Sequence, residues 1–222
     1  MKETILCVSD LHSPFMHSDT VKFLTHLKSK YKPTKIVFIG DILDHYMLSQ
    51  FKHSTKSQTA AQELTGAIES LFPIYKLFPE AYLVKGNHDN RFEKIADQAG
   101  IPGQYLKEFK DTICAPKKWQ FVDEVEIDGI LFTHGDGYTS QSWTTITRFT
   151  HKNTVIGHTH ANAGLIHSNN LWALNVGCLI DDSSYAFHYA RTCKIRGSLG
   201  CGVIQGTKTG YIPMWIPLNS FL

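Results

Sequence analysis

Side chains able to bind metal ions or transfer protons follow five separate apolar segments of the chain, residues 4–9, 35–39, 81–85, 130–133 and 154–156. The residues after these segments read Asp10-Leu11-His12, Gly40-Asp41-Ile42-Leu43-Asp44, Gly86-Asn87-His88-Asp89, His134-Gly135-Asp136 and Gly157-His158-Thr159-His160. One such motif alone is typical of a turn or a helix cap. Because every one of the five segments ends in Asp, Asn or His, the set indicates one shared site.

The donor atoms in these motifs are imidazole nitrogens and carboxylate or amide oxygens. This combination suits Mn, Fe, Zn, Co or Ni better than Ca or a structural zinc ion. Two Asp, one Asn and four His exceed the needs of one ion, whereas two ions sharing a bridging carboxylate would use them all. The five cysteines show no C-x-x-C spacing, so reduced thiols are expected rather than a disulfide framework or a zinc knuckle.

The first three apolar segments alternate with helical patterns. A helix is expected from about residue 18, and another from about residue 57 that Pro73 kinks or ends. This order predicts parallel strands with right-handed crossovers, whose loops gather at one edge of the sheet. Short helices are expected at 91–98 and 104–110, then mostly strands, including 164–167, 171–176, 202–205 and 211–215, with a hairpin turn at Asn169-Asn170.

The composition limits the class of protein. The chain has 222 residues, of which 42% are hydrophobic and 19% charged, and a net charge of +2. These values are typical of a soluble globular domain and not of a membrane or disordered protein. Lys and Arg are dispersed, which speaks against a dedicated duplex-DNA binder but leaves nucleic acid open as a partner. No leader follows Met1, so we expect a cytoplasmic protein without a membrane partner.

In their order, the motifs D-x-H, G-D-x-x-D, G-N-H-D, H and G-H-x-H resemble those of the calcineurin-like metallophosphoesterase family. The match runs from Asp10 to His160, about two-thirds of the chain. The resemblance implies an α/β (α+β) fold with a central β-sandwich flanked by helices in four layers. We therefore expect a single calcineurin-like phosphoesterase domain over residues 1–222.

The resemblance also implies roles for individual residues. The implied metal ligands are Asp10, His12 and His160 for the first ion, Asn87, His134 and His158 for the second, and Asp41 as the bridge. In similar enzymes the counterpart of His88 acts on the substrate phosphate or its leaving oxygen, and Asp44 orients it and would keep it protonated. Two such ions, with Mn²⁺ expected first, would clamp a phosphate and make hydroxide available for attack.

Two further residues are candidates for substrate contact. Arg91 could bind phosphate through two parallel hydrogen bonds, although an exposed helix Arg explains it equally well. Protein Ser/Thr phosphatases of the family continue the second motif as G-D-x-x-D-R-G, whereas His45-Tyr46 follow Asp44 here. This departure speaks against a phosphoprotein substrate and makes His45 a candidate for substrate contact instead.

Three functions are compatible with these residues. The first is hydrolysis of phosphomonoesters, with a nucleotide or another small phosphate as substrate. The second is a phosphodiesterase or nuclease acting on cyclic nucleotides or nucleic acid. The third is a non-catalytic scaffold, but scaffolds similar to this family lack the substrate-side His, and His88 is present. The sequence does not indicate an oligomeric state.

Overall fold

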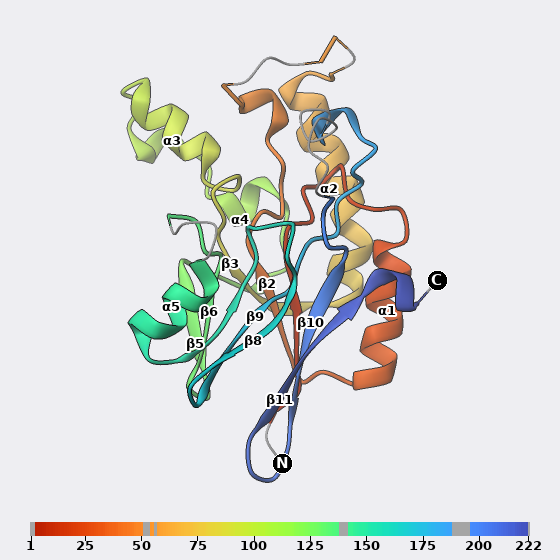
Figure 1. The fold of residues 1–222 in the computed structure, drawn as a ribbon. Helices are drawn as coiled ribbons and strands as arrows, with labels where there is room; N and C mark the ends of the chain where they lie inside the picture. Colours follow the sequence, from red (N-terminus) through yellow and green to blue (C-terminus); the bar gives the residue numbers. More distant parts are fainter. Residues whose placement is uncertain (1–2, 51–53, 56, 138–141, 188–195, 222) are drawn as a thin grey trace.

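Two β-sheets packed face to face form the centre of the protein (Figure 1). The computed structural model describes residues 3–50, 54, 55, 57–137, 142–187 and 196–221. The first sheet has the order β11-β10-β1-β2-β3-β4. Its strands are β1 (Ile5–Val8), β2 (Lys35–Ile39), β3 (Glu80–Val84), β4 (Lys118–Val122), β10 (Gly200–Gly206) and β11 (Tyr211–Pro217).

The second sheet has the order β5-β6-β7-β9-β8. Its strands are β5 (Glu124–Ile127), β6 (Ile130–Thr133), β7 (Asn153–Ile156), β8 (Gly164–Ser168) and β9 (Leu171–Asn175). β8 and β9 form the expected hairpin around Asn169, which adopts a positive φ of 55°. β6, β7 and β9 are parallel to one another, as are β1, β2, β3 and β4. The predicted parallel arrangement of the first three strands is confirmed.

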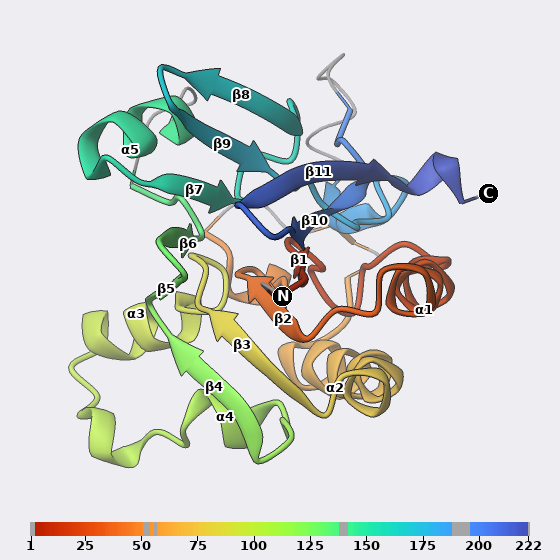
Figure 2. The same cartoon turned by 90° about the horizontal axis from the view of Figure 1, so that it is seen from below.

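Alternation along the central strands gives the first sheet two apolar faces. On one face, Leu6 and Phe38 pack with the buried residues of α1 (Thr20–Tyr31) and α2 (Ala60–Leu77). On the other face, Ile5 and Val37 share a core with Phe132 of the second sheet. Figure 2 shows α1 and α2 on one side of the paired sheets and α5 (Ser142–Thr150) on the other. The predicted sandwich with helices outside it, in four layers, is confirmed.

One helix, α5, was not expected from the sequence, and α2 continues past the proline within it. α2 continues for four residues beyond Pro73, because the buried Leu71 and Ile74 pack against the core on both sides of the proline. α5 was not expected, since its Thr-rich sequence has weak helix propensity; its Ile146 packs against the second sheet. No helix in the described part of the chain is both long and apolar enough to cross a membrane.

The segment between β3 and β4 lies over the carboxyl end of β3. It contains α3 (Arg91–Gln98), the short helix η2 (Gly103–Tyr105) and α4 (Phe109–Thr112). The helix expected at residues 104–110 is therefore split into two shorter turns. Another short helix, η1 (Tyr46–Leu48), follows β2 and packs against both α2 and α3.

Candidate active site

The five motifs meet at one edge of the sandwich because the strands before them run in the same direction in each sheet. β1, β2 and β3 carry the first three motifs at their carboxyl ends, and β6 and β7 carry the last two. Ligands of parallel α/β sheets commonly bind at this edge. Seven predicted metal-binding side chains converge here: Asp10, His12, Asp41, Asn87, His134, His158 and His160.

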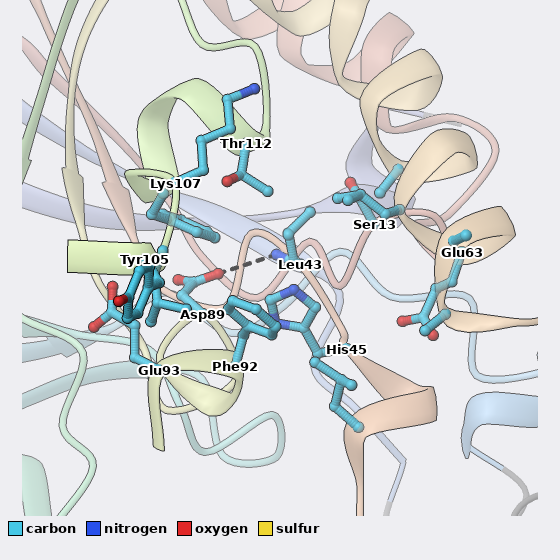
Figure 3. A pocket seen from close by; sticks show the side chains of 17 residues that line it. Ser13, Leu43, His45, Glu63, Asp89, Phe92, Glu93, Tyr105, Lys107 and Thr112 are labelled. Atoms are coloured by element: carbon cyan, nitrogen blue, oxygen red, sulfur yellow. Dashed lines mark hydrogen bonds between the residues drawn. The ribbon is translucent and has the colours of Figure 1, made fainter. Parts of the chain in front are cut away.

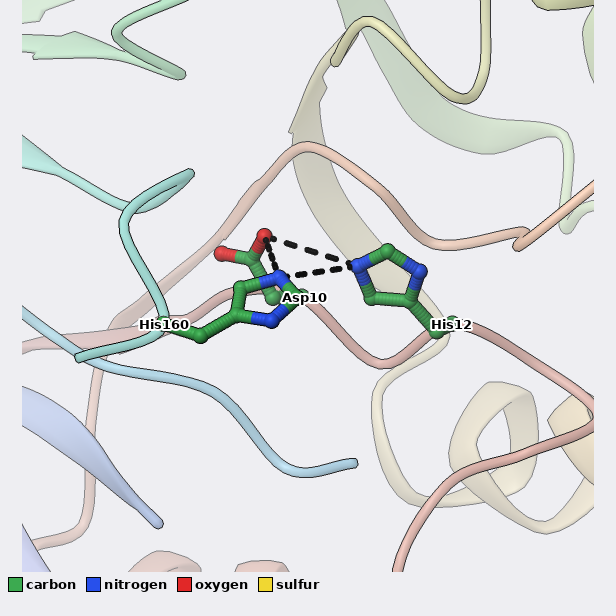
Figure 4. Close-up of side chains that lie close together, drawn as sticks. All are labelled: Asp10, His12 and His160. Carbon is green, nitrogen blue, oxygen red and sulfur yellow. Dashed lines mark hydrogen bonds and ion pairs between the residues drawn. The ribbon is translucent and has the colours of Figure 1, made fainter. Parts of the chain in front are cut away.

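Asp10, His12 and His160 form a first cluster of donor atoms (Figure 4). Nε2 of His160 lies 3.1 Å from both Nε2 of His12 and Oδ1 of Asp10. Nε2 of His12 lies 3.7 Å from the same Asp10 oxygen. Two ligand atoms that each lie about 2.1 Å from one ion, at an angle near 100°, are about 3.2 Å apart. The spacing of this cluster therefore fits a transition-metal ion.

A second cluster of donor atoms surrounds Nε2 of His134. This nitrogen lies 3.3 Å from Oδ2 of Asp41, 3.2 Å from Oδ1 of Asn87 and 3.2 Å from Nδ1 of His158. His134 is almost fully buried, so water does not replace these partners. The second cluster therefore has the same donor spacing as the first.

One oxygen of Asp41 faces both clusters. Oδ2 of Asp41 lies 3.3 Å from Nε2 of His134 in the second cluster and 3.7 Å from Nε2 of His12 in the first. The other oxygen, Oδ1, accepts a hydrogen bond of 2.8 Å from the backbone N–H of His88, which fixes the carboxylate plane. Asp41 therefore has the position that a bridging ligand requires.

The protonation states of the buried histidines and carboxylates in the two clusters depend on one another. Burial alone would lower the pKa of His12, but the nearby carboxylate of Asp10 and the hydrogen-bonded carboxylate of Asp44 outweigh burial and raise this pKa to about 10. His134 follows the same pattern beside Asp41, and its pKa is raised to about 10. Burial acts to raise the pKa of Asp41, yet the positive charge of His134 holds it well below its usual range. Bound cations would take the place of these protons, because a histidine must be neutral to bind a metal.

Partners outside the clusters set the orientation of two histidine rings. Nδ1 of His12 donates to Oδ1 of Asp44 at 2.6 Å, and Nδ1 of His134 donates to the carbonyl oxygen of Ile39 at 2.8 Å. Both rings consequently present Nε2 to the clusters. Such partners fix the tautomer of a metal-binding histidine and increase its basicity.

Asp44 contacts both His12 and His88, through different atoms. Nδ1 of His88 donates at 2.6 Å to the backbone oxygen of Asp44, whereas the carboxylate of Asp44 lies 3.6 Å away and is bound to His12. Nε2 of His88 accepts a hydrogen bond from Arg91 at 3.1 Å. Burial, despite the opposing charge of Asp41, lowers the pKa of His88 to about 4. Asp44 therefore contacts His12 through its carboxylate and His88 mainly through its backbone oxygen.

Arg91 and His45, the two candidates for substrate contact, both lie against His88. Nη1 of Arg91 donates to the backbone oxygens of Asp44 and His45, at 3.1 and 2.8 Å. Nδ1 of His45 donates to the backbone oxygen of His88 at 2.8 Å. These bonds show that both side chains connect the loops after β2 and β3, and that Arg91 is not simply an exposed helix residue.

Asp89 and Phe187 have roles that the sequence reasoning did not assign. The buried carboxylate of Asp89 accepts from the backbone N–H groups of Leu43 and Gly86, at 3.1 and 3.0 Å, and so connects the same two loops. Its position as the last residue of the motif G-N-H-D is the sequence feature that could have indicated this role. The ring of Phe187 packs edge-on against His12, with centroids 5.4 Å apart, and no sequence motif marks it.

Backbone strain is concentrated at the ends of these strands. Asp10, His12, Asp41 and His158 have φ values of 51°, 47°, 50° and 63°, in the left-handed region that favours glycine. Non-glycine residues remain in this region only where the surrounding structure holds them, and such residues are common at functional sites. Here all four of these residues contribute donor atoms to the two clusters.

Comparisons with known proteins identify a family for the chain. A family model described as calcineurin-like phosphoesterase matches residues 3–185. The solved phosphoesterase YfcE from E. coli is 12% identical, with 91% of this chain and 88% of that chain covered and a TM-score of 0.47. Vps29 from Entamoeba histolytica, complexed with Zn²⁺, is 14% identical, with 93% and 87% covered and a TM-score of 0.48. A predicted phosphoesterase from Streptococcus pneumoniae is 13% identical, with 96% and 88% covered and a TM-score of 0.44. No curated protein matches the sequence.

Proposed function

Because the chain belongs to the calcineurin-like phosphoesterase family, we propose that it hydrolyses phosphomonoesters with the help of two divalent metal ions. The proposed substrate is a nucleotide or another small phosphorylated compound. Mn²⁺ is the first choice of metal, and Fe, Zn, Ni and Co are the alternatives that the same nitrogen and oxygen donors accept.

The position of Asp41 carries this proposal. Its Oδ2 lies within 3.7 Å of Nε2 of His12 and within 3.3 Å of Nε2 of His134, so one oxygen is shared by two donor clusters. The donors fit catalytic transition-metal ions, since no thiolate belongs to either cluster among the described residues. A purely structural role for these groups would leave several buried charges facing one another without a benefit to stability.

The seven donor residues would each hold one or both of the metal ions. Asp10, His12 and His160 would hold the first ion, Asn87, His134 and His158 the second, and Asp41 both. Two ions held in this way neutralise phosphate charge and lower the pKa of water. The chain itself contributes rigid orientation, because Asp44 and the backbone oxygen of Ile39 fix the rings of His12 and His134.

We assign substrate contact to His88 and its partner Arg91. The ring of His88 packs edge-on against that of His12, with centroids 4.6 Å apart, and is therefore next to the first cluster without being one of its donors. Nη2 of Arg91 lies 3.1 Å from Nε2 of His88, so the two nitrogens form one hydrogen-bonding unit. To donate to a phosphoryl or leaving oxygen, His88 would have to carry a proton on Nε2 in place of the hydrogen bond from Arg91. A hydrogen bond of this kind strengthens as negative charge develops on the oxygen.

The test compares monoester and diester substrates on metal-stripped protein. Mn²⁺, Zn²⁺, Ni²⁺, Co²⁺, Fe²⁺ or Mg²⁺ is restored singly, and turnover of p-nitrophenyl phosphate is measured against its bis ester, followed by nucleotides, cyclic nucleotides and single-stranded DNA. We expect metal-dependent monoester turnover. Asp41→Asn should lower both turnover and metal content, whereas Asp97→Asn, an exposed carboxylate on α3, should change neither.

Two results would contradict the proposal. Cleavage of the bis ester alone would make the protein a phosphodiesterase or nuclease. No turnover of any ester, with the metal content intact, would instead favour the non-catalytic scaffold.

A further inference from the structure

A largely apolar cavity of about 430 Å³ lies next to the candidate active site, between α2 and the segment that runs from α3 to α4 (Figure 3). None of the seven proposed metal-binding residues lines it. His45 and Asp89, which connect the loops after β2 and β3, both do. The cavity is therefore distinct from the two donor clusters but shares a wall with the loops that support them.

Apolar side chains from both sides form the walls of this cavity. Ala61 and Leu64 of α2 lie on one side, and Phe92, Tyr105 and Leu106 lie on the other. The side chains of Phe92 and Tyr105 remain 46% and 82% exposed, so two aromatic rings stand at the open side of the cavity without being buried by the fold. A ligand that covers these rings would gain hydrophobic stabilisation.

Within the described part of the chain, one buried polar group of the cavity lining has no hydrogen-bond partner. The hydroxyl of Ser13 is buried, with the residue only 1% exposed, and none of the described residues forms a hydrogen bond with it. In contrast, the three carboxylates at the wall are already engaged. Glu63 accepts from the backbone of Tyr46 and Met47, Asp89 from that of Leu43 and Gly86, and Glu93 from Nζ of Lys85. A buried hydroxyl without a partner is unusual, and a bound ligand is one way to satisfy it.

The charge of the lining indicates what kind of molecule fits. Glu63, Asp89 and Glu93 line the cavity against a single cation, Lys107. This balance disfavours anions such as phosphate, while the apolar walls disfavour any ion. We propose that the cavity binds an uncharged aromatic molecule that carries one hydrogen-bonding group, which pairs with the hydroxyl of Ser13.

The experiment uses the full chain and N-phenyl-1-naphthylamine, a neutral aromatic amine whose fluorescence rises in apolar surroundings. We expect saturable binding that persists after the metal ions are removed. Ala61→Trp and Leu106→Trp would fill the cavity from opposite walls, and each should weaken binding by at least about 10-fold, as expected when a ligand is excluded by overpacking. Thr65→Trp, one turn further along α2 and outside the lining, is the matched control and should bind like the wild type.

The role of Ser13 has its own test. Ser13→Ala should weaken binding of the amine by about 2- to 10-fold, the usual contribution of one hydrogen bond. Binding of 1-phenylnaphthalene, which has the same rings but no N–H group, should not change. Equal weakening of both probes would show that Ser13 forms no bond with the ligand.

Three outcomes would overturn the proposal as a whole. The first is fluorescence that rises linearly without saturation, and the second is equal loss of binding in Thr65→Trp and Ala61→Trp. The third is displacement of the probe by Mn²⁺ with inorganic phosphate, which would place it in the active site. Circular dichroism of each variant distinguishes a filled cavity from an unfolded protein. Because Ala61→Trp and Leu106→Trp change different walls of the cavity, they give two independent measurements of binding.

Discussion

The carboxylate of Asp44 accepts a hydrogen bond of 2.6 Å from Nδ1 of His12, whereas Nδ1 of the neighbouring His88 donates to the backbone oxygen of Asp44 and lies 3.6 Å from its carboxylate. Asp44 therefore acts on the first donor cluster through His12. Its role can be separated from that of His88, although the two residues lie in adjacent loops and both belong to the family motifs.

The first prediction is that Asp44→Asn weakens metal binding at the first cluster by about 10- to 100-fold, as is typical when the partner of a metal-binding histidine is lost. Competition with a chelator measures the affinity, and excess Mn²⁺ should restore much of the lost turnover. If affinity stays at the wild-type level while turnover falls, Asp44 acts through His88, as the sequence alone had suggested.

The second prediction concerns His88. His88→Ala should reduce turnover of p-nitrophenyl phosphate by about 10²- to 10⁴-fold, the usual contribution of a group that assists the reacting oxygen. Its metal content should remain close to the wild-type value, because Nδ1 and Nε2 of His88 are occupied by the Asp44 backbone and Arg91. Elemental analysis provides the check, with His167→Ala, an exposed histidine on β8, as the control. Loss of metal in His88→Ala would show that this residue is itself a ligand.

The sequence predicted which residues converge at the site better than it predicted how their side chains are oriented there. Apolar runs that end in Asp, Asn or His place these residues at strand ends, and parallel pairing brings the ends together without further information. The direction of the Asp44 carboxylate follows from its hydrogen bond to His12, a contact between residues 32 positions apart that no local sequence pattern marks. The cavity beside α2 was equally hidden, since Ser13 and Tyr105 meet there only through tertiary packing.

The third prediction tests the close approach of two strand ends. A Cβ atom on Gly86 would collide with Oδ1 and the backbone nitrogen of Asp41 and would lie 2.9 Å from its Cγ. Gly86→Ala should therefore destabilise the protein by about 1–3 kcal/mol and move Asp41 away from the clusters. Urea unfolding gives the stability change, and metal analysis reports the displacement.

Gly103→Ala is the matched control for this substitution, because its Cβ atom would meet nothing within 4 Å. It should leave both stability and metal content near the wild-type values. Similar losses in the two variants would mean that the effect of Gly86→Ala does not come from contact with Asp41.

The fourth prediction follows from the protons in the ion-free clusters. Hydrogen bonds and nearby carboxylates raise the pKa values of His12 and His134 to about 10. Both rings are therefore protonated on both nitrogens and positively charged between pH 7 and 9. Each must lose one proton to bind a cation, and metal affinity should therefore rise with pH over this range, by up to about 10-fold per unit for each proton released.

Calorimetric titration with Mn²⁺ in buffers of different ionisation enthalpy counts the released protons. We expect a smaller count in His134→Asn than in the wild type. His158→Asn should weaken binding without changing the count, because burial, reinforced by the charge of His134, lowers the pKa of His158 and leaves this ring neutral. A binding enthalpy that does not depend on the buffer would show that the clusters hold no exchangeable protons, and the carboxylates of Asp10 and Asp41 would then have to be balanced in another way.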